Sequence, residues 1–170
     1  MVRYVAVGLG IATLLILNSP AIGEPDRTEV YAINLLRGIQ TAEELHFANH
    51  GYYDTLQCLA SPACVGTPRV SSPAYQGLIA ADVAALKDYR AYTLQFYAGP
   101  RSSAPPTSSL ATPLNDYAMV LMPKAGSQPL RPSLCGDRTG IYVTPGTRIP
   151  RVRDGRCQDT SRSLEWALME

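Results

Sequence analysis

Apolar residues recur at steps of three and four between positions 32 and 47, and this is the clearest pattern in the chain. The stripe comprises Ala32, Leu35, Leu36, Ile39, Ala42, the aliphatic part of His46, and Phe47. Such spacing places side chains on one face of an α-helix. Asp26 with Glu29 three residues later supplies a helix start, and Gly51 supplies a left-handed cap at its end. The pattern predicts one long amphipathic helix.

Two later segments are predicted to form β-strands. Residues 89–97 alternate, with Tyr92, Leu94 and Phe96 on one face, and residues 117–122 form a second strand. Residues 134–135 and 141–143 flank a short turn containing two glycines, which is typical of a hairpin. We therefore expect a small antiparallel sheet after the helix.

The connecting segments carry weaker signals. Residues 78–88 are rich in alanine and leucine and predict a short second helix. Residues 52–73 and 99–113 are expected to be loops, and 145–156 an irregular basic segment. Residues 164–169 predict one closing helical turn. The expected fold is α+β: a long N-terminal helix packed on a small antiparallel sheet, a short second helix, and a disulfide-closed C-terminal region.

The first residues have the three-part plan of a secretory signal peptide. Arg3 precedes an apolar run at 5–17, which Pro20 and its neighbours end, and small residues then lead to Gly23. The run is shorter than the roughly 20 residues of a membrane span. We predict a signal peptide at 1–23, cleaved after Gly23, and one domain at 24–170; the alternative is an uncleaved N-terminal anchor.

All cysteines follow this leader. They are Cys58, Cys64, Cys135 and Cys157. An even number in an exported chain predicts disulfides, and four cysteines allow three pairings. We favour Cys58–Cys64 with Cys135–Cys157, because each bond closes a local loop. The alternative is zinc, although C-x5-C with a distant C-x21-C matches no usual zinc pattern.

Charge excludes a general attraction to nucleic acid or anionic membranes. The whole chain carries a formal net charge of +1, and removal of Arg3 with the leader balances acidic and basic residues. Basic residues nevertheless concentrate near the C-terminus, at Arg148, Arg151, Arg153 and Arg156. Such a loop predicts binding of an anionic polymer, either DNA or an acidic glycan. The alternative is a solvated loop with local Arg–Asp pairs of little energetic value.

Candidate catalytic groups are few. His46 and His50 are spaced i, i+4, with Glu43 one turn earlier, which makes the histidines weak candidates for a metal site. The motif lacks the glutamate between the histidines that HExxH requires, so the alternative is a half-buried histidine and a histidine at the helix C-terminus. No G-x-S-x-G elbow occurs. We therefore predict no catalytic residues, no cofactor, no small-molecule substrate and a non-enzymatic protein.

Four sequence fragments resemble those of a known family. They are Leu36-Arg37-Gly38-Ile39-Gln40-Thr41-Ala42-Glu43, Gly51-Tyr52 with Leu56 and Leu59, Tyr92-Thr93-Leu94, and Leu134-Cys135-Gly136-Asp137 with Thr139-Gly140-Ile141-Tyr142. In this order and spacing the chain resembles type IV pilin-like proteins, in particular short exported ones of acidobacteria. The resemblance implies an N-terminal helix on an antiparallel sheet and a role in a pilus, pseudopilus or related secretion or adhesion apparatus.

The chain departs from the family plan at its N-terminus. A prepilin carries Glu at the fifth mature position, whereas the fifth position after Gly10 is Leu15, and Pro20 ends the apolar run early. We therefore expect a soluble or peripheral protein, periplasmic or secreted, that contacts protein partners of an envelope or pilus-like assembly through an apolar strip at residues 30–36. Trp166 is expected to anchor the C-terminus. The competing functions are an anion-binding module and a metal enzyme at His46 and His50.

Overall fold

A computed structural model describes residues 27–65, 77–126, 131–145 and 148–158. The predicted signal peptide with its cleavage site at Gly23 lies outside these residues. So do the closing turn at 164–169 and Trp166 within it. These three predictions therefore stay predictions.

The predicted long helix is confirmed as α1 (Arg27–His50). It ends where Gly51 adopts a left-handed conformation with φ of 77°, and the Gly51 N–H donates to the Phe47 carbonyl at 2.7 Å. A glycine tolerates this conformation without steric cost. Phe47 lies at the edge of the buried stripe, 42% exposed, with its ring stacked on Tyr53.

The five-stranded antiparallel sheet follows the chain order β1-β2-β3-β4-β5. Its strands are β1 (Asp88–Tyr89), β2 (Tyr92–Ala98), β3 (Tyr117–Pro123), β4 (Ser133–Asp137) and β5 (Gly140–Thr144). The predicted strands and the predicted hairpin are thus confirmed. The single strand expected at 89–97 is wrong at its start, because Arg90 turns the chain with φ of 54° and separates β1 from β2.

The predicted second helix is shorter than expected. It consists of one turn, α4 (Ala81–Ala84). The N-cap residue is Ala80, whose methyl side chain makes no capping hydrogen bond. Asp88 belongs to β1 instead, because it pairs with Thr93. The segment expected to be a loop at 52–73 contains two further one-turn helices, α2 (Leu56–Leu59) and α3 (Pro62–Val65). Helices of one turn are too short to show a hydrophobic period.

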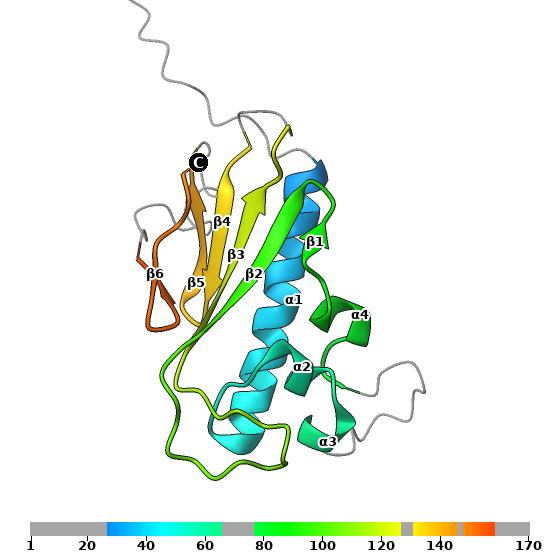
Figure 1. Ribbon diagram of the computed structural model, residues 1–170, viewed down its shortest axis with the longest axis vertical. Helices are drawn as coiled ribbons and strands as arrows, with labels where there is room; N and C mark the ends of the chain where they lie inside the picture. Colours follow the sequence, from blue (N-terminus) through cyan, green and yellow to red (C-terminus); the bar gives the residue numbers. More distant parts are fainter. Residues whose placement is uncertain (1–26, 66–76, 127–130, 146–147, 159–170) are drawn as a thin grey trace, which may run out of the picture.

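Helix α1 covers one face of the sheet (Figure 1). Alternate residues of the strands point toward it, among them Met119, Leu121 and Leu134, and form one core with Ala32, Leu36 and Ile39 of α1. Gly136 of β4 faces Leu36 of α1, and a Cβ at that position would lie 3.6 Å from the Leu36 side chain, an ordinary van der Waals distance. The buried apolar faces of the helix and the sheet hold the two layers together.

A small hairpin packs on the opposite face of the sheet. It consists of β6 (Val152–Arg153) and β7 (Arg156–Cys157), with Asp154 and Gly155 at its turn in left-handed conformations. Val152 and Cys157 contact the second set of alternate residues, including Val120 and Tyr142. The expectation of an irregular segment at 145–156 is therefore wrong in part. The Asp-Gly dipeptide is the signal for this hairpin in the sequence.

Both favoured disulfide pairings are confirmed. Cys58–Cys64 joins α2 to α3, and Cys135–Cys157 joins β4 to the C-terminal hairpin. Among the described residues, no helix has both the length and the apolar character needed to cross a bilayer.

Candidate functional site

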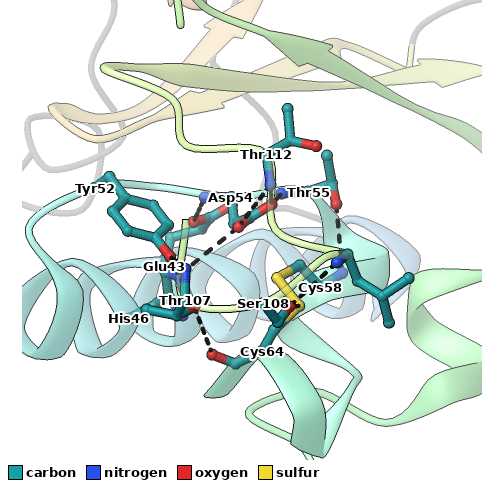
Figure 2. Close-up of polar contacts among 11 residues, drawn as sticks. Glu43, His46, Tyr52, Asp54, Thr55, Cys58, Cys64, Thr107, Ser108 and Thr112 are labelled. Carbon is teal, nitrogen blue, oxygen red and sulfur yellow. Dashed lines mark hydrogen bonds and ion pairs between the residues drawn. A yellow bond between two sulfur atoms is a disulfide. The ribbon is translucent and has the colours of Figure 1, made fainter. Parts of the chain in front are cut away.

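Three ionisable side chains meet in the interior near the C-terminal end of α1. Glu43 and His46 come from α1, Asp54 comes from the turn after it, and all three are fully buried. The Asp54 N–H donates to Glu43 Oε2 at 3.1 Å (Figure 2). His46 Nε2 lies 4.0 Å from Asp54 Oδ2, which is too long for a hydrogen bond. Gly51 brings Asp54 back onto α1, because it reverses the chain at the helix end.

This buried cluster fixes the long loop between β2 and β3. The Asp54 carboxylate accepts the Thr112 N–H with both oxygens, at 2.9 and 3.1 Å. The Tyr52 hydroxyl accepts the Thr107 N–H at 3.0 Å and bonds the Thr107 hydroxyl at 2.8 Å. Two positions of the loop are therefore held by residues that follow α1.

The disulfide-linked turn α3 supplies a third attachment. The Thr107 hydroxyl donates to the Cys64 carbonyl at 3.3 Å, and the Ser108 hydroxyl lies 3.3 Å from Cys64 Sγ (Figure 2). The Cys58–Cys64 bond ties α3 to α2, which the Thr55 hydroxyl caps through the Cys58 N–H. The cluster and the first disulfide together hold the segment 107–112 in one conformation.

Burial favours the neutral form of each group in the cluster. It raises the pKa of Glu43 well above the usual value, against the opposing effect of the Asp54 N–H bond. It also raises the pKa of Asp54 and lowers that of His46 to about 4, with a further contribution from the charge of His50. Since these side chains are fully buried, they do not reach a substrate at the surface. The cluster is suited to holding a loop rather than to catalysis.

His46 and His50, the candidate metal ligands, lie close together but differ in their exposure to solvent. The rings of His46 and His50 have centroids 4.5 Å apart, and His46 is fully buried whereas His50 is half-buried. Across the described residues, no three His, Cys, Asp or Glu side chains are grouped so that they could hold a metal ion. Among the residues that the structure describes, neither ring nitrogen of His46 has a hydrogen-bond partner. We therefore assign His46 to the polar interior.

The structure separates the four candidate anion-binding arginines into two groups. Arg156 Nε bonds Asp116 Oδ2 at 2.6 Å, and Arg138 Nε lies 3.1 Å from Oδ1 of the same carboxylate. This pairing raises the pKa of Arg156 further. Arg148, Arg151 and Arg153 are exposed, and Arg153 faces Asp154 at 3.5 Å. Arg156 is also exposed, at 47%, but its contact with Asp116 helps to attach the hairpin to the sheet.

Two buried aspartates that sequence reasoning did not single out hold the C-terminal hairpin. Asp116 makes the two arginine contacts at the start of β3. Asp137 accepts the Cys157 N–H at 2.8 Å with one oxygen and the Thr139 N–H at 2.8 Å with the other. Asp137 lies in the predicted hairpin and could have been assigned as a turn residue. Asp116 carries no such signal.

The outward face of α1 exposes several large apolar side chains. Val30 and Tyr31 are each 42% exposed near the helix N-terminus, and Leu45 is 50% exposed further along. The Arg90 guanidinium stacks on the Tyr31 ring at 3.8 Å from its centroid. Ala32, Ile33 and Leu36 face the sheet instead. The expected exposed strip at residues 30–36 is therefore reduced to Val30, Tyr31 and the half-buried Leu35.

Comparison with known proteins shows no family to which this chain can be assigned. The chain matches no family model, no curated protein and no solved structure.

Proposed function

We propose that this protein is an exported, non-enzymatic, pilin-like component of an envelope assembly of the pilus or secretion type. The observation that carries the proposal is α1 packed along one face of an antiparallel sheet (Figure 1). Val30 and Tyr31 are exposed near the N-terminal end of this helix. Tyrosine and arginine are enriched among the residues that contribute most to binding at protein interfaces. Tyr31 and Arg90 are both exposed at this end of the helix.

The compartment of the proposed function is extracytoplasmic. The apolar run at 5–17 supports export, and the two disulfides form and persist in oxidising compartments. A balanced charge leaves apolar contacts, rather than electrostatic attraction, as the basis for joining an assembly. Protein partners of such an assembly are therefore the expected ligands.

Cell fractionation of variants in the natural host tests this proposal. Wild-type protein is expected in the periplasm and bound to envelope fractions. A Val30→Ser, Tyr31→Ser double variant should remain exported and folded but lose envelope binding. Leu45→Ser is the control, because Leu45 lies on the same helix and is 50% exposed against 42% for Val30 and Tyr31; it should bind as wild type does. Recovery of wild-type protein only from the cytoplasm would contradict the proposal.

A second candidate function is the binding of an anionic polymer by the exposed arginines. Three exposed guanidinium groups, on Arg148, Arg151 and Arg153, lie on one short segment. Arginine forks pair with phosphate or carboxylate groups bidentately. Retention of the mature domain on heparin or DNA at low salt, lost in a triple Arg→Gln variant, would support this function. Arg37→Gln on α1 is the control for charge alone.

A further inference from the structure

A polar hollow of about 310 Å³ lies between the C-terminal hairpin and the residues that lead into β3. Volumes from about 300 Å³ upward are typical of sites for small ligands. Six polar side chains line the hollow: Asn115 and Asp116 on one wall, and Arg153, Asp154, Arg156 and Gln158 on the other. Residues that are 40 positions apart in the sequence therefore meet around one concave surface.

The two walls of the hollow are fixed against each other. The turn of the hairpin packs directly on the opposite wall, because a Cβ at Gly155 would lie 2.7 Å from Gly99 Cα. The Gly99 N–H in turn donates to the Asp116 carbonyl at 2.9 Å. The Cys135–Cys157 disulfide ties the hairpin to β4 beside the hollow. A ligand that enters it therefore orders little of the protein, which favours binding.

Asp116 holds the Arg156 guanidinium in one orientation. The Asp116 side chain is only 7% exposed, and its Oδ2 accepts Arg156 Nε at 2.6 Å. Among the residues that the structure describes, the Nη groups of Arg156 make no further hydrogen bond. An oriented guanidinium with donors to spare is suited to pairing with a carboxylate of a ligand.

The other lining groups can both donate and accept hydrogen bonds. Arg153 is 80% exposed and lies 3.5 Å from the Asp154 carboxylate, an exposed pair of little energetic value. The side-chain amides of Asn115 and Gln158 each carry donors and an acceptor, and the carboxylate of Asp154 accepts only. Hydroxyl groups, which also donate and accept, match this lining.

The charge around the hollow favours an acidic ligand that is rich in hydroxyls. The two arginines and two aspartates in the lining balance, but three further exposed arginines adjoin it: Arg101, Arg138 and Arg151. Their carbonyl or guanidinium groups contact lining residues directly. The lining carboxylates repel the closely spaced phosphates of DNA, whereas they accept hydrogen bonds from sugar hydroxyls.

We propose that this hollow binds a uronic acid residue of an acidic glycan. The carboxylate of the sugar pairs with the guanidinium groups of Arg153 and Arg156, and its hydroxyls bond to Asn115, Gln158 and Asp154. The site rests on the second candidate function, which it narrows from any anionic polymer to an acidic glycan.

Titration of the purified, disulfide-bonded mature domain with tetragalacturonate, followed by amide NMR, tests this site. The amide signals of Asn115, Arg156 and Gln158 are expected to shift together and to saturate. The methyl ester of the same oligosaccharide keeps its hydroxyls but lacks the charges, and should bind about tenfold more weakly or worse. A single-stranded DNA oligonucleotide of the same net charge should also bind about tenfold more weakly or worse.

Variants of exposed lining residues test the contacts one at a time. Arg153→Gln should weaken tetragalacturonate binding about tenfold, and Asn115→Ala about fivefold. Both positions are exposed, so the fold is expected to persist. Arg148→Gln is the matched control, because Arg148 is an exposed arginine of the same segment outside the lining. It should change the affinity less than about twofold.

Three outcomes would overturn the inference: equal binding of the methyl ester, equal losses in Arg148→Gln and Arg153→Gln, or no shift at the lining residues. Retention on heparin or DNA without binding of tetragalacturonate would remove this inference alone and leave the second candidate function. Binding of tetragalacturonate by a domain that neither heparin nor DNA retains would remove the second candidate function alone.

Discussion

Asp54 accepts the backbone N–H of Thr112 with both carboxylate oxygens, at 2.9 and 3.1 Å. The bond joins the turn after α1 to a loop that is distant in sequence. Because Asp54 is fully buried, water cannot replace it as the acceptor. This contact connects the helix, the polar cluster and the loop between β2 and β3.

Removal of the Asp54 carboxylate should therefore destabilise the whole domain. Asp54→Ala leaves the N–H groups of Thr112 and Thr55 without their acceptor. We expect the free energy of unfolding to fall by about 2 to 3 kcal/mol in urea denaturation. Asp88→Asn removes only an exposed ion pair with Lys124 and should change it by less than about 0.5 kcal/mol. Equal effects of the two substitutions would contradict the role assigned to Asp54.

His46 should make stability depend on pH below neutrality. Its pKa is about 4 in the folded protein against 6.5 for the ordinary side chain, so the unfolded chain takes up the proton first as pH falls. The contribution of neutral His46 is present above pH 6.5 and is lost between 6.5 and 4, about 3 kcal/mol in all. The free energy of unfolding of wild type and of His46→Leu should be measured at both ends of this pH range. The change in their difference reports the contribution of His46 apart from those of Glu43 and Asp54. A difference independent of pH would contradict the assignment.

Glu43 should make stability depend on pH in the direction opposite to His46. Burial raises its pKa, so its contribution is full below the ordinary value of 4.5 and is lost as pH rises through the folded value. Glu43→Gln keeps an oxygen for the Asp54 N–H but cannot ionise. The variant should be as stable as wild type at pH 4 and more stable at pH 8, measured by urea denaturation. A variant that is less stable at pH 8 would show that ionised Glu43 is stabilising.

Gly155 should tolerate no side chain. It has φ of 72°, and a Cβ there would lie 2.7 Å from Gly99 Cα. We expect Gly155→Ala to lower the free energy of unfolding by about 3 kcal/mol, from backbone strain and overpacking together. Gly126 has a similar φ of 82° but nothing within 4 Å of its added Cβ, so Gly126→Ala measures the backbone term alone, about 1 kcal/mol. Thermal unfolding of the two variants should separate the terms.

Local patterns predicted the larger elements of the fold. The apolar period predicted α1, the alternation at 89–97 predicted β2, and local loop closure predicted both disulfide pairings. A strand was also predicted at 117–122, where β3 lies. Elements of two to four residues, such as β1, β6 and α2, escaped prediction because they are shorter than the period that identifies them. Their positions depend on turns, as at Arg90 and Gly155.

The polar interior could be predicted only in part. Glu43 lies three residues before His46 and four after Ile39, so its place on the buried stripe was visible in the sequence. Its meeting with Asp54 depends on the chain reversal at Gly51. The pair of Asp116 with Arg156 joins residues 40 positions apart, and only the packing of the hairpin on the sheet brings them together.

Site-specific photo-crosslinking in the natural host tests the central claim most directly. A photoreactive amino acid at position 31 should crosslink the exported protein to an envelope component, because Tyr31 lies at the exposed N-terminal end of α1. The same probe at Thr41, exposed on the same helix, should give no such product. Equal products at both positions, or none from protein confirmed to be outside the cytoplasm, would contradict an assembly role for this end of the helix.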